Sequence, residues 1–467
     1  MEETEEDVGG FGKRGRRRAA FDRDWTKGSI IGNLLSLSWP MIINDSLSML
    51  GPTIDMVWVG KLGTASMAGV GVSGLAVQLV NSARRGLSMG TRAMVARFVG
   101  TGDTEGANHA AQQAIAISAV FATLLAVIGI FFAEPLLILM GLEADVVAQG
   151  AAYLRIMFVG SVAMSLRVMT EGVMESSGDV VTPLKIAVFY RVFHVALAPI
   201  LIFGWWIFPR LGVSGAALTN VIAQGLGVIL GLLVLFSGRT RLRLTLKNFH
   251  LDRNMIWRIV RIGIPATVTG MERSFANLVM MWFVVPFNTM AVAAHGLVHR
   301  IEQFMHRPAM GMGMAAGVLT GQNLGARQPE RAERTGWQAT GVVTAAMFLL
   351  SVAIWFWAED IVRIFNTEPE LVEIASTFLR IHIAGFLVFG FASTVAQCLN
   401  GVGDTLPTML VTLLGMWVVQ VPLAFLLPRV TNLGVYGIRW AIVSDLVVRA
   451  VTYTIYFKVG RWKHKKV

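Results

Sequence analysis

The sequence predicts an all-α integral membrane protein with twelve transmembrane helices in two pseudo-symmetric six-helix bundles, an N-lobe and a C-lobe, that form a V-shaped cleft. Composition is the first reason: of 467 residues, 54% are hydrophobic and 15% are charged, whereas soluble domains are about 25% charged. An internal repeat, described below, is the second reason. Long apolar runs predict helices, because only helices or closed barrels satisfy their backbone groups in lipid.

Twelve apolar segments fall into two sets of six. The first set is 33–56, 65–92, 108–132, 150–174, 182–204 and 213–236, and the second is 257–284, 290–320, 335–357, 372–399, 406–428 and 434–458. We therefore expect a polar tail (1–32), an N-lobe (33–238), a basic connector (239–256), a C-lobe (257–459) and a basic C-terminal tail (460–467).

The basic residues between the apolar segments indicate the orientation. They gather in the tail, near Arg97, in the connector, near Arg331 and at the C-terminal end. Because cytoplasmic loops are rich in Lys and Arg, we expect a multi-pass plasma-membrane protein with both termini in the cytoplasm. The net charge of +11 does not indicate nucleic acid, because the basic residues lie mostly between the spans. We expect a monomer in the bilayer, and the single Cys398 excludes an internal disulfide.

The first span combines a helix-bending residue with buried acids. Pro40 lacks a backbone donor and is expected to kink the helix. Asp45 and Asp55 place carboxyl groups at membrane depth, where an ionised group costs roughly 3 kcal/mol or more. A kinked helix that carries a costly acid indicates a moving part with an ion-coupled function.

The two halves repeat each other at a constant offset in the numbering, the offset that takes Pro40 to Pro265. Glycines, prolines and charged residues match as well as apolar ones: Gly86 with Gly311, Gly100 with Gly325, Glu105 with Glu330, and Gly178-Asp179 with Gly403-Asp404. Six spans per half insert the same way up, so the halves should be related by an axis along the membrane normal. The cleft between such halves is where transporters bind substrate.

Several motifs together resemble the MATE (multidrug and toxic compound extrusion) family over roughly residues 30–460. They are Pro40 with Asp55 fifteen residues later, Gly60-x-Leu-Gly63, Gly86-Leu-Ser-Met-Gly90, Gly321-Gln-Asn-Leu-Gly-Ala326, and the two Gly-Asp pairs at 178–179 and 403–404. The resemblance implies export of organic cations or similar amphipathic small molecules in exchange for protons or sodium. The internal repeat places Pro265 at the position of Pro40, so we expect a helix kink at each of these prolines.

By resemblance, Asp55 matches the acid of the family's N-lobe cation site. Many members have Asp-Pro in the fifth span, but this chain has Ala198-Pro199, with His194 one helical turn earlier. Because the aspartate of the fifth span is replaced by Ala198, a sodium site built from several carboxylates is less expected here. An Asp–Glu–His cluster fits protons at least as well. The candidate coupling residues are Asp55, Glu171, His194, Asn220 and, in the C-half, Glu272.

The eighth span carries a polar stripe. Steps of four, three and four residues place His295, His299, Glu302 and His306 on one helical face. The pattern resembles a metal site, but no second helix offers a Cys/His set, so we expect no metal and no cofactor. A proton relay, a substrate-facing stripe and a buried salt bridge to Arg273 or Arg300 stay open. Candidate residues of the substrate cleft are Arg191, Met271, His299 and Glu302.

Two other functions compete with export. Arginines at membrane depth, such as Arg84, Arg85 and Arg167, either pair with acids or attract an anionic substrate. They would also suit a lipid-linked oligosaccharide flippase, as ligands of a pyrophosphate group. An integral membrane enzyme is the other alternative, but the chain offers no clustered nucleophile and base and no phosphate-binding glycine loop. We therefore expect a transporter, not an enzyme.

Overall fold

The structure, a computed structural model, describes residues 24–205, 207–247 and 249–465. Within these residues all regular structure is helical. The N-terminal half contains α2 (Ile30–Gly60), α3 (Thr64–Thr101), α4 (Thr104–Leu139), α5 (Ala144–Val159), α6 (Ser161–Ser177), α7 (Val181–Phe203) and α8 (Gly212–Phe236). Of the predicted tails, residues 1–23 and 466–467 lie outside the described residues.

The C-terminal half contains α9 (Arg253–Val284), α10 (Thr289–Gly325), α11 (Pro329–Arg363), α12 (Pro369–Gly401), α13 (Thr405–Leu414), α14 (Val421–Val430) and α15 (Tyr436–Val459). A π-helical stretch, Gly415–Gln420, joins α13 to α14, and a short 3-10 turn, Arg461–His464, follows α15. The sequence predicted one uninterrupted span over 406–428 and did not predict this π-helical stretch.

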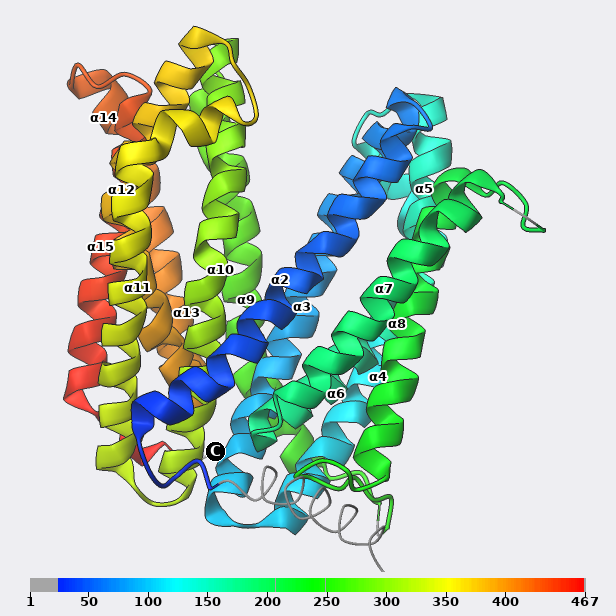
Figure 1. The fold of residues 1–467 in the computed structure, drawn as a ribbon, viewed down its shortest axis with the longest axis vertical. Helices are drawn as coiled ribbons and strands as arrows, with labels where there is room; N and C mark the ends of the chain where they lie inside the picture. Colours follow the sequence, from blue (N-terminus) through cyan, green and yellow to red (C-terminus); the bar gives the residue numbers. More distant parts are fainter. Residues whose placement is uncertain (1–23, 206, 248, 466–467) are drawn as a thin grey trace, which may run out of the picture.

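The helices form two bundles that meet at one end and diverge toward the other (Figure 1). Helices α2–α8 form the N-lobe and α9–α15 form the C-lobe. With α5 and α6 as one bent span and α13, the π-helical stretch and α14 as another, each lobe has six spans among the described residues. The predicted fold class is confirmed.

One predicted span, 150–174, is broken. Helices α5 and α6 are bent by 45° relative to each other, and Gly160 stands between them. A Cβ atom at Gly160 would lie 2.1 Å from a methyl group of Val221 on α8. The break therefore occurs where a neighbouring helix approaches the backbone closely, a tertiary contact that hydropathy does not report.

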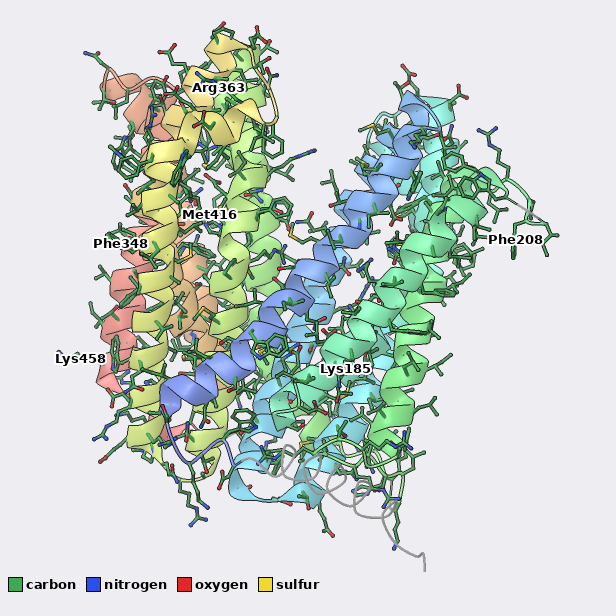
Figure 2. The ribbon with its side chains drawn as sticks, in the orientation of Figure 1. Lys185, Phe208, Phe348, Arg363, Met416 and Lys458 are labelled. Atoms are coloured by element: carbon green, nitrogen blue, oxygen red, sulfur yellow. The ribbon has the colours of Figure 1, made fainter. Side chains whose placement is uncertain are left out.

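The four helices at the centre of the molecule are the most polar. Among the described residues, seven helices are long and apolar enough to cross a membrane, or eight if the bent pair counts as one span. The four remaining long helices are α2, α3, α9 and α10, and these contact one another between the lobes. Exposed apolar side chains cover the outer faces of the two lobes, and Phe348 on α11 is one of them (Figure 2). Polar groups are thus kept away from the lipid-facing surface.

The contacts between the lobes follow the internal repeat. A Cβ atom at Gly86 on α3 would lie 2.0 Å from Oγ1 of Thr267 on α9, and one at Gly311 on α10 would lie 2.7 Å from Cγ1 of Ile42 on α2. The repeat relates Gly86 to Gly311, and it relates Ile42 to Thr267. The α3–α9 contact therefore has a symmetry-related counterpart in the α10–α2 contact.

A second contact relates α3 and α10 directly. A Cβ atom at Gly100 would lie 2.1 Å from the carbonyl oxygen of Gln322, and one at Gly325 would lie 2.3 Å from the carbonyl oxygen of Arg97. These residues are again related by the repeat, Arg97 to Gln322 and Gly100 to Gly325. The repeat thus places the pseudo-two-fold axis between α3 and α10. Glycine permits this backbone approach because it has no Cβ atom.

The basic connector, 239–256, is attached to the N-lobe by both apolar and polar contacts. Leu242 and Leu244 are buried against the N-lobe core. Side chains of α4 bind its backbone: Asn108 accepts from the N–H of Thr245, and Gln113 donates to the carbonyl oxygen of His250 over 2.7 Å. The sequence-based prediction overlooked the two apolar residues of this basic segment and the hydrogen bonds of its backbone with α4.

The start of α9 also differs from the predicted residue 257. Asp252 accepts hydrogen bonds from the N–H groups of Asn254 and Met255, at 2.8 and 3.2 Å. This N-cap begins the helix at Arg253, four residues early. The hydrogen bond from Met255 is the main reason why the pKa of Asp252 is below its ordinary value. Because a capped helix starts in the polar loop, hydropathy places its beginning too late.

Candidate ion-coupling site

Three of the predicted coupling residues meet inside the N-lobe. Asp55 on α2 is 2% exposed. His194 on α7 places Nε2 3.0 Å from Oδ1 of Asp55, and Asn220 on α8 donates from Nδ2 to Oδ2 over 3.3 Å. The carboxylate thus has one charged or polar partner on each of its two oxygens, and three helices converge on it.

Arg191 lies beside this group, within the lobe. Gly51 makes room for it on α2, because a Cβ atom there would lie 1.9 Å from Nη1 of Arg191. The same Nη1 lies 3.5 Å from Nδ1 of His194, and Asp55 is among the charges that act on the guanidinium. Arg191 is buried, so this conformation places it next to the coupling residues. Its predicted role in the substrate cleft stays a prediction.

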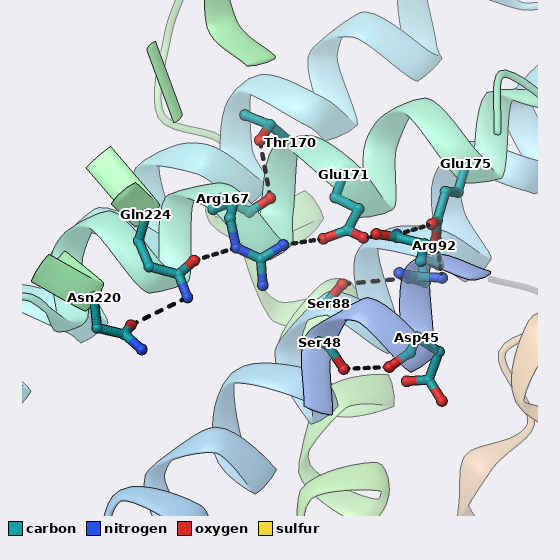
Figure 3. A network of polar contacts seen from close by, with 11 residues as sticks. Asp45, Ser48, Ser88, Arg92, Arg167, Thr170, Glu171, Glu175, Asn220 and Gln224 are labelled. Atoms are coloured by element: carbon teal, nitrogen blue, oxygen red, sulfur yellow. Dashed lines mark hydrogen bonds and ion pairs between the residues drawn. The ribbon is translucent and has the colours of Figure 1, made fainter. Parts of the chain in front are cut away.

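Glu171 is joined to Asp55 indirectly. Gln224 donates to Oδ1 of Asn220 over 3.4 Å, Arg167 donates from Nε to Oε1 of Gln224, and Arg167 forms an ion pair with Glu171. Figure 3 shows these side chains in one row, from Asn220 to Glu171. Asp55 and Glu171 are therefore not in direct contact, and three side chains link them.

The row continues across the lobe from Glu171. Asn44 on α2 donates to Glu171 and, over 3.2 Å, to Glu175. Arg92 on α3 pairs with Glu175 at 2.7 Å (Figure 3). Hydrogen bonds and ion pairs therefore form a continuous polar chain from Asp55 on α2 to Arg92 on α3. A change of charge at one end alters the electrostatic environment along the row.

In the C-lobe, Glu302 forms its salt bridge with Arg439 and not with the predicted Arg273 or Arg300. Arg439 on α15 places Nη1 2.8 Å from Oε1 of Glu302, and His382 on α12 places Nδ1 3.3 Å from the same oxygen. His299 lies 3.8 Å from Oε2. Glu302 is buried in this cluster, so its place in the substrate cleft stays a prediction, as does that of the half-buried His299.

Glu272, the fifth candidate coupling residue, also pairs with a residue of α15. Arg449 lies 3.2 Å from Oε1 of Glu272 and 2.7 Å from Oδ2 of Asp445. The guanidinium therefore bridges two acids on two helices. The predicted cleft residue Met271, one position before Glu272, is half-buried.

The two proline positions lie within long helices. Helix α2 continues through Pro40, and α9 continues through Pro265. Both residues are buried. The kinks predicted there stay predictions.

Among the described residues, no group of three or more His, Cys, Asp or Glu side chains could hold a metal ion. The residues of the predicted polar stripe on α10 instead contact different partners. His306 stacks on Phe389 with ring centroids 3.7 Å apart, and Glu302 pairs with Arg439.

Sequence reasoning missed the partners on α12 and α15 and three polar residues of the N-lobe chain. The missed residues are Asn44, Arg92, Gln224, His382, Arg439, Asp445 and Arg449. The signal for three of them was present: Arg439, Asp445 and Arg449 are ionisable residues within the last apolar segment, and such residues pair or face a polar interior.

A duplicated, two-lobed helical fold that buries ionisable groups inside its lobes is the fold of a membrane transporter. The sequence model of the MatE family matches the chain twice, at residues 40–200 and 265–426. The two matches begin at Pro40 and Pro265, which the internal repeat relates to each other. The chain belongs to the MATE family of multidrug and toxic compound extrusion transporters.

Relatives and solved structures agree with this assignment. The chain is 26% identical over 436 residues to a probable multidrug resistance protein, YoeA, of Bacillus subtilis, covering 92% of this chain and 93% of that protein. It is 25% identical over 425 residues to a FAD transporter of Shewanella oneidensis, covering 90% and 93%. An outward-facing multidrug resistance MATE transporter has a TM-score of 0.87 at 22% identity, covering 93% of this chain and 96% of that chain.

Proposed function

We propose that this chain is a secondary active antiporter that exports amphipathic organic compounds in exchange for protons by alternating access. The names of its relatives, multidrug resistance proteins among them, support small organic substrates. The distribution of basic residues supports a plasma-membrane location with both termini in the cytoplasm. With that orientation, the lobes meet on the cytoplasmic side and diverge on the outer side (Figure 1).

The contacts of Asp55 carry the proposal of proton coupling. Its carboxylate is buried and contacts an imidazole nitrogen and an amide N–H group. Both partners are nitrogen atoms, whereas a sodium ion would need several oxygen ligands directed at it. Aspartate and histidine side by side can both exchange protons. Sodium remains the alternative coupling ion, and the transport assay below separates the two.

Protonation of Asp55 can change how the helices of the N-lobe attract one another. The ionised carboxylate on α2 faces His194 and Arg191 on α7. Adding a proton removes the negative charge between these two groups, and the attraction between α2 and α7 weakens. Because α2 also packs against the C-lobe through Leu34 and Leu37, this change reaches the contact between the lobes. Such a link between charge and helix position is what coupled transport requires.

The two alternatives predict different behaviour. A lipid-linked oligosaccharide flippase would use the arginines for a pyrophosphate group and would not export dyes. A membrane enzyme would need a nucleophile and a base in contact, and the ionisable groups described above are ion-paired with one another instead.

Purified protein in proteoliposomes tests the proposed function. We expect an imposed pH gradient without sodium to drive the accumulation of a fluorescent amphipathic dye, and a sodium gradient at equal pH to drive none. Accumulation that needs sodium at fixed pH would contradict proton coupling. No gradient-driven accumulation of any dye would contradict the exporter.

The polar chain predicts coupled effects of His194 and Glu171. We expect His194→Ala to shift the pH dependence of transport, because His194 contacts Asp55 directly. Glu171→Gln should shift it too, through Arg167, Gln224 and Asn220, and the double variant should differ from the sum of the single effects. The measurement is the initial transport rate against pH for all four proteins. An unchanged profile in every variant would assign the chain a purely structural role.

A further inference from the structure

Near the level at which the two lobes diverge (Figure 1), a group of charges lies between them that the coupling site does not use. We name it the inter-lobe cluster: Asp45 on α2, Arg85 on α3, Arg273 on α9 and Arg307 on α10. Each of the four central helices contributes one member, two from each lobe. Arg307 pairs with Asp45, and Arg273 contacts Met310 on α10. Arg85 directly precedes Gly86, which packs against Thr267 of α9, so the four residues lie in one region between the lobes.

The cluster lies next to a close contact between the lobes. Asp45 follows Ile42 by three residues, and Arg307 precedes Gly311 by four, and Ile42 packs directly against Gly311. One helical turn separates each charge from that contact, on the side toward which the lobes diverge. The charges are therefore positioned near the level at which the two lobes begin to diverge (Figure 1).

The charges in the cluster do not balance. Arg307 places Nη1 3.0 and 2.9 Å from the two oxygens of Asp45, so these two residues neutralise each other. Within the part of the chain that the structure describes, Arg85 and Arg273 have no ion pair within 4.0 Å. Glu272, the neighbour of Arg273 in sequence, is engaged by Arg449. Two exposed guanidinium groups thus lack a carboxylate partner.

The internal repeat does not account for these charges. The repeat relates Asp45 and Arg85 to Gly270 and Met310, and it relates Arg273 and Arg307 to Ser48 and Ser82. The glycines that join the lobes have kept the duplicated pattern, but every member of the cluster has an uncharged counterpart. Unpaired charge at membrane depth is costly, and such residues line substrate paths.

We propose that Arg85 and Arg273 bind the carboxylate or phosphate group of an amphipathic organic anion, which is the substrate class of this transporter. The inference rests on the proposed export function and replaces the organic cation that the family resemblance implied. A guanidinium matches the geometry of carboxylate and phosphate, with two parallel N–H donors. Met310, whose sulfur lies 3.9 Å from Nη1 of Arg273, offers a polarisable apolar surface for the rest of the molecule.

Two dyes of opposite charge test the proposal in proteoliposomes with an imposed pH gradient. The anionic probe is carboxyfluorescein and the cationic probe is ethidium. We expect carboxyfluorescein to be transported with the lower KM. In the Arg85→Gln/Arg273→Gln double variant, its KM should rise at least about ten-fold, because each charge-assisted hydrogen bond contributes about 1.5–3 kcal/mol. Arg363→Gln, which changes an exposed arginine on α11, is the matched control and should leave KM unchanged.

Two further measurements test the proposal even if the Arg85→Gln/Arg273→Gln double variant does not fold. Arg85→Lys/Arg273→Lys keeps the charge and should retain part of the affinity. Binding of carboxyfluorescein to the purified unmodified protein, followed by fluorescence polarisation, should weaken as salt increases. Salt-independent binding, or an equal KM in all variants, would overturn the proposal. Transport of ethidium without carboxyfluorescein would overturn it and leave the exporter standing, whereas transport of neither dye would overturn both.

Discussion

Asp55→Asn is expected to abolish transport driven by a pH gradient. Asparagine keeps the size of the side chain and its contact with Asn220, but it cannot bind and release a proton. The buried His194 and Arg191 would lose the negative charge that faces them, so the lobe would stay in one charge state. We expect the initial rate of dye accumulation to fall to the level of protein-free vesicles.

Glu105→Gln is the matched control for that experiment. Glu105 is an exposed acid in the first turn of α4, so its neutralisation should leave the rate unchanged. Both variants should elute from size exclusion as the unmodified protein does. Transport by the Asp55→Asn variant at the rate of the unmodified protein would remove Asp55 from the coupling mechanism.

Gly90→Ala is expected to lower the stability of the protein by forcing α3 and α9 apart. A Cβ atom at this position would lie 2.2 Å from the carbonyl oxygen of Ile259 on α9, a backbone atom that cannot rotate away. Helices α3 and α9 would have to separate, and overpacking of this kind costs about 1–3 kcal/mol. Because the contact joins the lobes, we also expect a fall in transport rate.

The same substitution at Gly74 provides the control. Gly74 also lies on α3, and no atom would come within 4 Å of its Cβ. Alanine there should leave Tm unchanged or raise it, since Gly in a helix interior is less favourable than Ala by about 0.5–1 kcal/mol. The measurement is the Tm of both variants in the same detergent, which should be lower for Gly90→Ala than for Gly74→Ala. An equal Tm for the two variants would show that the α3–α9 contact is not tight.

The architecture was predictable because its signals are distributed over many residues. Apolar length indicated the spans, and the internal repeat paired Gly86 with Gly311, which pack against symmetry-related partners in the structure. Departures from regular spans were not predictable. The break at Gly160 depends on Val221 of another helix, and the anchoring of the connector depends on Asn108 and Gln113 of α4.

The candidate site was predictable only in part, for a related reason. Asp55, His194 and Asn220 matched positions of a family motif, and the structure brings these three together. The arginine partners of Glu302 and Glu272 lie on α15, the last long helix of the chain and far from both acids in sequence. Which face of a distant helix meets an acid depends on helix rotation and packing, and sequence spacing within one helix does not contain that information.

Proton release on substrate binding tests the central claim most directly. Purified protein in weakly buffered detergent solution, with a pH-sensitive dye, is mixed with saturating carboxyfluorescein or ethidium. Because substrate and proton are proposed to exchange through Asp55, the unmodified protein should release protons on addition of whichever probe it transports, and the Asp55→Asn variant should release none. Equal release from both proteins, or no release from an unmodified protein that binds the probe, would contradict proton coupling at Asp55.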